Sequence, residues 1–338
     1  MYAEVWGMKI AVIGATGLVG SVMCTELDRL VANDFELLLA ASSRSVGRKI
    51  EFRGRELCVQ SIADVMAARP DIALFAAGSA VSLEYAEQFA QKGTYVVDNS
   101  SAWRMHPDVP LVVPEINANA LRVDAHIVAN PNCSTIQMVM ALAPLRAFGL
   151  KRIHVSTYQS VSGSGMKGIE QLRAEREGRA PQERAYPYPI DLNCIPHCDE
   201  FLENGYTKEE MKLINEPRKI FNLPHLAISA TAVRVPVWGG HSETVNAEFE
   251  HPITPNEARE LIAAMPGVTV VDAPSQHHYP MARDAHGSDQ VFVGRIRQDL
   301  AIGEKALTMW VVADNIRKGA ATNAVQIVTA LIAKGCCQ

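Results

Sequence analysis

The sequence predicts an α/β protein with a doubly wound parallel sheet at the N-terminus and an α+β domain with a mixed sheet after it. Up to about residue 130, short apolar runs of strand length alternate with helical patterns, which is typical of a parallel sheet covered by helices. After residue 150 the strand patterns are longer and alternate apolar with polar residues. Such alternation indicates a mixed or antiparallel sheet with one covered face.

The first domain is read from its apolar runs. Residues 8–15 form a strand-length run, and the helical pattern of residues 17–30 carries a stripe of Val19, Met23, Leu27 and Leu30. Further buried strands are expected within 35–42, 71–78, 94–100 and 125–130, and a helix within 81–93.

In the second half, residues 151–163, 227–238 and 241–251 predict long strands. Residues 166–220 are expected to be rich in loops and partly helical. The alanine-rich segment 314–335 predicts a helix, which we expect to pack back on the first domain.

Composition excludes several classes of protein. The chain of 338 residues is long enough for two domains, and its net charge of −5 argues against a nucleic-acid partner. No apolar run approaches the roughly 20 residues of a membrane span, and the start lacks a signal-peptide pattern. The seven cysteines are odd in number and irregularly spaced, which indicates reduced thiols and a cytoplasmic location. Residues 1–7 are expected to be a short extension before Met8.

A metal site is not expected. The segment "CIPHC" at 194–198 brings Cys194, His197 and Cys198 together, but no second ligand pair lies nearby in the sequence. Zinc usually takes four ligands, so we predict no metal.

A glycine-rich loop follows the first predicted strand. In "AVIGATGLVGS", glycines at 14, 17 and 20 stand between a buried strand and a helix, where they permit a tight turn and let backbone N–H groups approach a pyrophosphate. The spacing G-x-x-G-x-x-G is less usual than G-x-G-x-x-G, and a glycine-rich turn without a ligand is the alternative. The residues predicted to bind a dinucleotide here are Gly14, Thr16, Gly17, Leu18 and Val19.

The end of the second predicted strand favours NADP over NAD. An acidic residue there would bind the ribose 2′-hydroxyl of NAD. This chain instead has Ser42, Arg44 and Ser45, and hydroxyls with a guanidinium suit a 2′-phosphate. An ordinary solvated arginine is the alternative for Arg44.

Cys133 lies where a strand, the turn "NPN" and a helix meet. The positive end of a helix stabilises a thiolate, which makes Cys133 a candidate nucleophile. A packed cysteine at a strand end is the alternative.

His241 is the candidate partner for that nucleophile, because it follows a Gly-Gly turn at the head of a strand. Arg234, on the preceding strand, is placed to clamp a carboxylate with two parallel hydrogen bonds. The alternative is a buried histidine beside a structural salt bridge. In "STYQSVSGSGMKG", Gln159 is a candidate contact for a substrate carbonyl, and Ser162 and Gly163 are candidates for the nicotinamide end of a cofactor.

Taken in order, "GATGLVG", "NPNCST", "YQSVSGSG", "RVPVWGGHSE" and "DNIRKGAATNAVQ" resemble the aspartate-β-semialdehyde dehydrogenase family along nearly the whole chain. The resemblance implies a Rossmann-type NADP-binding domain, residues 1–132 with the C-terminal helix 315–338, and a catalytic and dimerisation domain, residues 133–314. It implies reduction of L-β-aspartyl phosphate by NADPH to L-aspartate 4-semialdehyde with release of inorganic phosphate. This step feeds lysine, diaminopimelate, threonine and methionine synthesis, and family members are homodimers or dimers of dimers.

The resemblance also assigns roles. Cys133 is similar to the family's nucleophile, His241 to its acid/base and Gln159 to the residue that orients the acyl intermediate. Arg234 is similar to the residue that holds the substrate carboxylate. The remaining assignments are phosphate binding by Arg104, Asn132 and Lys212, contact with the substrate amine by Glu209 in preference to Glu210, and a nicotinamide contact by Asn315.

Three rivals are weighed against this interpretation, and glyceraldehyde-phosphate dehydrogenases are disfavoured because their cysteine lies in an "SCTTN" context. N-acetyl-γ-glutamyl-phosphate reductases share the cofactor loop and the cysteine chemistry, but their cysteine usually lies in a "PGCY"-like setting rather than "PNCS". Their substrate amine is acylated, so an acid at Glu209 would have no ammonium to meet. A non-catalytic paralogue would be expected to lack the cysteine or the histidine, and this chain has both.

Overall fold

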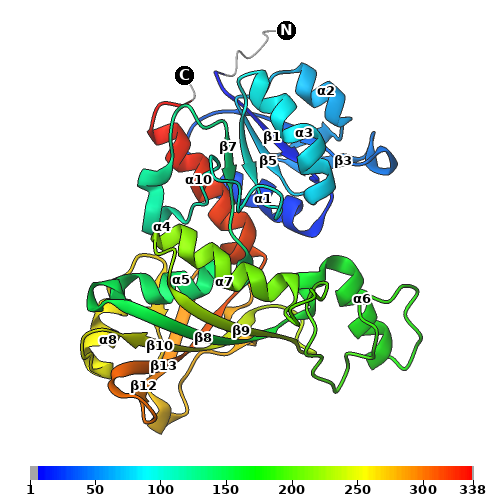
Figure 1. Ribbon diagram of the computed structural model, residues 1–338. Helices are drawn as coiled ribbons and strands as arrows, with labels where there is room; N and C mark the ends of the chain where they lie inside the picture. The colour runs from blue at the N-terminus through cyan, green and yellow to red at the C-terminus, as the bar shows by residue number, and fades with distance from the viewer. Residues whose placement is uncertain (1–6, 337–338) are drawn as a thin grey trace. The chain divides into compact units, whose positions relative to one another are not determined.

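The computed structural model describes residues 7–336 (Figure 1). The extension expected before Met8 therefore lies, except for Gly7, outside the described residues. The chain divides into two compact units, of which the second is Asn132–Gly319 and the first comprises the chain up to Pro131 and again from Ala320.

The first unit is built on a five-stranded sheet whose paired strands are all parallel, in the order β2-β1-β5-β6-β7. Its strands are β1 (Lys9–Ile13), β2 (Glu36–Ala40), β5 (Ile72–Phe75), β6 (Tyr95–Asp98) and β7 (Ile127–Ala129). Each is almost entirely buried, because helices cover parallel strands. The expected strands of the first domain are confirmed.

The helices of this unit are α1 (Leu18–Leu30), α2 (Ile62–Ala67), α3 (Ser79–Gln91), α4 (Pro114–Asn117) and α10 (Thr322–Ala333). The C-terminal α10, red in Figure 1, packs against α1, and the Thr322 hydroxyl donates to the buried Glu26 carboxylate at 3.1 Å. A hairpin of β3 (Lys49–Phe52) and β4 (Arg55–Cys58) extends from this unit. Its short polar strands carry no long apolar run, and the sequence analysis did not predict it.

The second unit holds a six-stranded mixed sheet in the order β11-β12-β13-β10-β8-β9. Its strands are β8 (Leu150–Gln159), β9 (Ala227–Arg234), β10 (His241–Phe249), β11 (Val268–Val270), β12 (Val291–Asp299) and β13 (Gly303–Ala313). Strand β10 runs antiparallel to β8 and β13, whereas β8 and β9 are parallel. The α/β fold class, with a parallel and then a mixed sheet, is confirmed.

The α-helices of the second unit are α5 (Cys133–Leu142), α6 (Gly165–Arg176), α7 (Lys208–Phe221), α8 (Pro255–Ala263) and α9 (Ala282–Ala285). Nine residues of α5, Ser134 to Leu142, are buried, whereas α7 is amphipathic and packs on both α5 and β9. The helix expected over 314–335 begins at Arg317 with a π-helical turn, Arg317–Ala321, which continues without a break into α10. A Cβ on Gly319 would stand 2.9 Å from the Cβ of Cys133, so only glycine fits this turn.

Candidate active site and cofactor loop

The loop between β1 and α1 has the geometry expected of a dinucleotide loop. Gly14 has φ +95°, which favours glycine, and its N–H donates to the Ala40 carbonyl at 2.8 Å. A Cβ on Gly20 would lie 2.1 Å from the Gly14 carbonyl oxygen, so the helix approaches the loop too closely for any side chain. The N-cap of α1 is Gly17, which has no side chain to occupy the helix N-terminus. These backbone features fit a bound pyrophosphate.

The serine–arginine segment after β2 lies beside this loop. Ser43–Ser45 form a short 3₁₀ turn, and the Thr16 hydroxyl donates to the Ser45 hydroxyl at 3.4 Å. Ser42 and Arg44 are exposed, so both are accessible to a ligand. Leu18 and Val19 lie in the first turn of α1.

Arg104 also belongs to the first unit, and it is buried. Its Nε donates to the Asn130 carbonyl at 2.9 Å and its Nη2 donates to the Asn99 carbonyl at 3.0 Å. Backbone carbonyls of two segments therefore fix the direction of this guanidinium.

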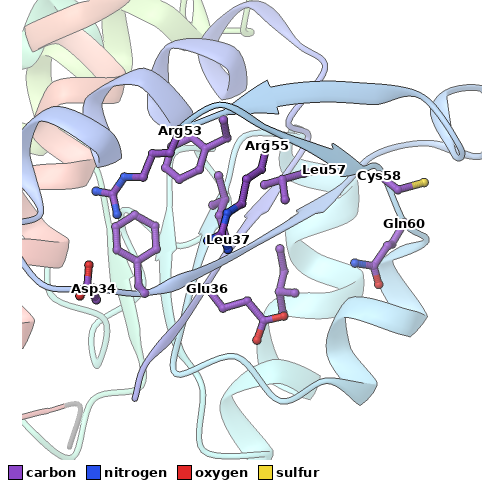
Figure 2. A pocket seen from close by; sticks show the side chains of 11 residues that line it. Asp34, Glu36, Leu37, Arg53, Arg55, Leu57, Cys58 and Gln60 are labelled. Atoms are coloured by element: carbon purple, nitrogen blue, oxygen red, sulfur yellow. The ribbon is translucent and has the colours of Figure 1, made fainter. Parts of the chain in front are cut away.

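A pocket of about 390 Å³ lies between β2 and the β3–β4 hairpin (Figure 2). The Arg53 guanidinium stands over the rings of Phe35 and Phe52, at 4.8 and 5.3 Å from their centroids, and its Nε pairs with Asp28 at 2.6 Å. The residues that line this pocket all differ from those predicted to bind cofactor or substrate. It is therefore not the predicted site.

The predicted nucleophile is the first residue of α5. The N-cap is Asn132, whose side-chain oxygen accepts hydrogen bonds from the N–H groups of Ser134 and Thr135 at 3.0 and 3.2 Å. Cys133 is half-buried at the positive end of this helix, a position that favours the thiolate form. The backbone N–H of Asn132 donates to the buried Glu216 carboxylate at 2.7 Å, which anchors the turn.

A buried polar network surrounds the start of α5. The side-chain amide of Gln159 donates to the Ser134 hydroxyl and to Glu209 Oε1, both at 3.0 Å. Asn132 Nδ2 donates to the same carboxylate oxygen at 3.0 Å, and Lys212 Nζ pairs with the other oxygen at 3.0 Å. The network brings together five residues from three segments that lie far apart in the sequence, 132–134, 159 and 209–212.

Glu209 is ionised within this network. Burial alone would raise its pKa, but Lys212 and the hydrogen bonds from Gln159 and Asn132 outweigh burial and lower the pKa to about 2. Its neighbour Glu210 has a different task. Glu210 completes the capping box of α7 with Thr207 and accepts from the Ala232 N–H at 2.9 Å. Glu209 is therefore the acid that the local structure leaves facing the network.

His241 is fully buried at the head of β10. Its Nδ1 accepts the Ser160 N–H at 3.1 Å, whereas its Nε2 has no hydrogen-bond partner among the described residues. Burial lowers its pKa, and the Arg234 charge lowers it further, to about 3. The ring is neutral above about pH 5, and with Nδ1 accepting, its proton resides on Nε2.

Arg234 lies beside this histidine. Its Nη1 donates to the Ser160 carbonyl at 2.7 Å and its guanidinium carbon stands 5.8 Å from the Tyr186 ring centroid. Its Nε is buried without a partner in the described structure. A Cβ on Gly163 would come within 2.6 Å of Arg234 Nη1 and 3.1 Å of His241 Nε2. The glycine therefore keeps the space next to both groups clear of a side chain.

Asn315 organises the loops around the histidine. Its side-chain oxygen accepts from the hydroxyls of Ser160 and Ser162 at 3.0 Å and from the Gly240 N–H at 3.2 Å. Sequence reasoning singled out Ser162 and Asn315 but missed Ser160, which contacts His241, Arg234 and Asn315. The sequence feature that could have identified Ser160 is its position directly after Gln159, the last residue of β8.

No group of three or more metal-ligating side chains is found among residues 7–336. In the "CIPHC" segment Cys194 is exposed, whereas burial raises the pKa of Cys198 to about 11. Within the same described range, no helix is long and apolar enough to cross a membrane.

Two family models match the chain and define its class. The NAD binding domain of semialdehyde dehydrogenases matches residues 9–123, and the semialdehyde dehydrogenase dimerisation domain matches residues 142–318, more than half of the chain. The fold is thus that of a semialdehyde dehydrogenase, an oxidoreductase that uses a nicotinamide cofactor.

Relatives narrow the class. Aspartate-semialdehyde dehydrogenase of Aquifex aeolicus (strain VF5) is 50% identical over 338 residues, covering 97% of this chain and 99% of that protein. The Legionella pneumophila enzyme of the same name is 50% identical over 332 residues, covering 96% and 95%. The chain belongs to the aspartate-semialdehyde dehydrogenase family, and the family resemblance read from the sequence is confirmed.

Solved structures agree with this assignment. A crystal structure of aspartate semialdehyde dehydrogenase II from Vibrio cholerae, complexed with ASA, has a TM-score of 0.91 to this chain. The two are 42% identical, and the match covers 96% of this chain and 98% of that one. The predicted enzyme class is confirmed.

Proposed function

We propose that the chain catalyses the NADPH-dependent reductive dephosphorylation of L-β-aspartyl phosphate to L-aspartate 4-semialdehyde through a thioester on Cys133. One observation carries this proposal. The turn that presents Cys133 is hydrogen-bonded to Glu209, and through Ser134 to Gln159, while His241 holds an unpartnered Nε2 in the same unit. This combination supplies a nucleophile, a contact for a substrate amine and a donor for an oxyanion.

The Cys133 thiolate attacks the acyl phosphate carbonyl, the C–O bond to phosphate breaks, and a thioester forms. Arg104, Asn132 and Lys212 offset the charge on the leaving phosphate. When bound, the nicotinamide supplies a hydride to the thioester carbonyl. The tetrahedral oxyanion then collapses, which releases the aldehyde and regenerates the thiolate.

His241 assists at the oxyanion. The neutral ring with its proton on Nε2 is a hydrogen-bond donor. Once Cys133 is ionised, hydride addition and collapse to the aldehyde and thiolate need no proton, and the one proton that the overall reaction consumes is taken up by the leaving phosphate. The proposed role is therefore donation of a hydrogen bond from Nε2 to the developing negative charge, which is narrower than the acid/base role that the family resemblance implies. Removing a donor of this kind costs about 10²–10³-fold in rate.

Arg234 and Glu209 recognise the two charged groups of the amino-acid substrate. Arg234 keeps a buried, unpartnered Nε that supports a further hydrogen bond to a carboxylate. Glu209 is ionised by its neighbours and so attracts an ammonium group. Gln159 supports the acyl group, since its amide lies next to Ser134 on the nucleophile helix.

The proposed cofactor is NADP. The backbone of Gly14 and Gly17 cradles the pyrophosphate, with Thr16, Leu18 and Val19 beside it, and Ser42, Arg44 and Ser45 bind the 2′-phosphate. Ser162, Gly163 and Asn315 contact the nicotinamide end. The exposed guanidinium of Arg44 and the contact between Thr16 and Ser45 support this assignment.

At the level of the whole protein, we propose a NADP-binding domain of residues 1–132 with 315–338 and a catalytic and dimerisation domain of residues 133–314. The match to a dimerisation domain supports a homodimer, or a dimer of dimers.

The product would feed lysine, diaminopimelate, threonine and methionine synthesis in the cytoplasm. The six described cysteines form no disulfide, which suits that compartment.

The test is a spectrophotometric assay of NADPH formation from aspartate semialdehyde, inorganic phosphate and NADP. We expect turnover that requires phosphate. N-acetylglutamate semialdehyde is the control substrate, because its acylated amine offers no charge to Glu209. Equal or faster turnover of the control substrate, or no turnover of either aldehyde, would overturn the proposal.

A further inference from the structure

A buried carboxyl group that the proposed mechanism does not use lies beneath the nucleophile helix. Glu243 is on β10, two residues after His241, and has no exposed surface. Both of its carboxyl oxygens lack a hydrogen-bond partner of good geometry in the described structure. A buried ionised carboxylate without donors is strongly unfavourable, so this group needs an explanation.

Two polar atoms near Glu243 are also unpartnered. They are the Gln137 Oε1 on α5 and the hydroxyl of Thr157, the residue opposite Glu243 on β8. Gln137 Oε1 can only accept a hydrogen bond, and an ionised carboxylate can only accept as well. A protonated carboxyl group, in contrast, has an O–H to donate to this amide oxygen, and an amide N–H can bond back to the acid carbonyl.

The charges around Glu243 also favour the neutral form. Burial raises its pKa well above the ordinary value, and the negative Glu209 on α7 raises it further. Ser134 and Gln137 on α5 lower it, but not enough to compensate. From the neighbouring strands the residues in register are Thr157 and Val311, neither of which carries a charge.

The neutral group would lie at a junction of the proposed active site. Gln137 Nε2 donates to the His241 carbonyl at 3.3 Å, which ties α5 to the head of β10. Ser134 accepts from Gln159 Nε2 at 3.0 Å, next to Cys133. Gln137 thus contacts His241, and Ser134 contacts Gln159. The proposed mechanism gives a role to both His241 and Gln159.

We propose that Glu243 is a positioning residue that works as a neutral carboxylic acid. Its O–H donates to Gln137 Oε1 and so fixes the helix of Cys133 against the backbone of His241. An ionised Glu243 would break this bond and place a second negative charge near the thiolate. The expected effects on kcat rest on the proposed function, whereas the protonation state of Glu243 is independent of it.

The experiment compares wild type with Glu243→Gln and Glu243→Met. The glutamine amide is neutral and donates as the acid does, whereas methionine keeps the volume but removes both donor and acceptor. We expect kcat of Glu243→Gln within about threefold of wild type, and kcat of Glu243→Met at least about tenfold lower with KM changed less. A loss in Glu243→Gln as large as in Glu243→Met would show that the charged carboxylate is needed and overturn the proposal.

Infrared difference spectroscopy of wild type minus Glu243→Gln at neutral pH reads the protonation state without substrate. A carboxylic acid C=O band that is present only in wild type is expected, and its absence overturns the proposal even if the methionine variant fails to fold. If the dehydrogenase assay fails while this band is present, the proposed function falls and the neutral acid stands.

A thermal titration adds a second check. A carboxyl group whose pKa is raised by folding contributes stability at low pH, which is lost as the pH rises above the ordinary value of about 4.3. Wild type should therefore lose more Tm than Glu243→Gln between about pH 5 and pH 9. Parallel curves would contradict a buried neutral acid.

Discussion

The cofactor loop and the cluster around Cys133 are built in opposite ways. The cofactor loop is formed mainly by backbone, because Gly14 and Gly20 allow the chain to turn closely. The Arg44 side chain beside it is exposed. The cluster around Cys133 is made mostly of buried side chains from six separate segments, 132–134, 159–162, 209–212, 234, 241 and 315, and each segment is hydrogen-bonded to at least one other. A site of the first kind should tolerate the loss of a side chain, whereas a site of the second kind should not.

Replacement of the nucleophile tests the cluster most severely. Cys133→Ser should lower kcat at least about 10³-fold, because a hydroxyl at neutral pH is a far weaker nucleophile than a thiolate. NADP affinity, measured by fluorescence titration, should stay the same. The matched control is Cys194→Ser, an exposed cysteine of the same unit, which should keep full activity. Comparable losses in both variants would refute the assignment.

Replacement of His241 should cause the second largest loss in kcat. His241→Leu removes the donor and should reduce kcat about 10²–10³-fold. His241→Gln retains an N–H donor and should lose less.

The histidine also predicts a pH profile. Its pKa is about 3 in the folded chain, below the ordinary 6.5, so its neutral form persists as the pH rises from about 5 to 8. The pH profiles of kcat/KM for wild type and His241→Gln should therefore have the same shape near pH 6.5. An ionisation there, lost in the variant, would indicate an imidazolium acid instead.

Arg234→Lys probes recognition within the cluster. A lysine keeps the charge but not the fork, so KM for aspartate semialdehyde should rise about 10–100-fold with a smaller change in kcat. Arg173→Lys, at an exposed arginine of α6 that pairs with Glu170, serves as the control. An unchanged KM would exclude a bidentate contact.

The smallest effect is expected at the cofactor loop. Arg44→Ala should weaken NADP binding about tenfold and leave NAD binding nearly unchanged, since only NADP carries the 2′-phosphate. Arg48→Ala removes an exposed charge four residues further on and should affect neither. Equal weakening of both dinucleotides by Arg44→Ala would place the guanidinium elsewhere on the cofactor.

The same contrast explains what the sequence could predict. The parallel sheet and the glycine loop are local patterns, because strand length, apolar runs and glycine spacing are read within about ten residues. Gln159 and Glu209, which are hydrogen-bonded to each other, lie 50 residues apart in the sequence. Only the pairing of β8 with β9 and the packing of α7 on β9 bring them together. The family resemblance named these residues, but it did not reveal the tautomer of His241, the task of Ser160 or the buried Glu243.

The covalent intermediate is the most direct test of the account. The enzyme is mixed with aspartate semialdehyde and NADP in phosphate-free buffer, quenched in acid, digested and analysed by mass spectrometry. Without phosphate to accept the acyl group, an aspartyl thioester should accumulate on the peptide that contains Cys133. An adduct on another residue, or none while one equivalent of NADPH forms, would contradict the account.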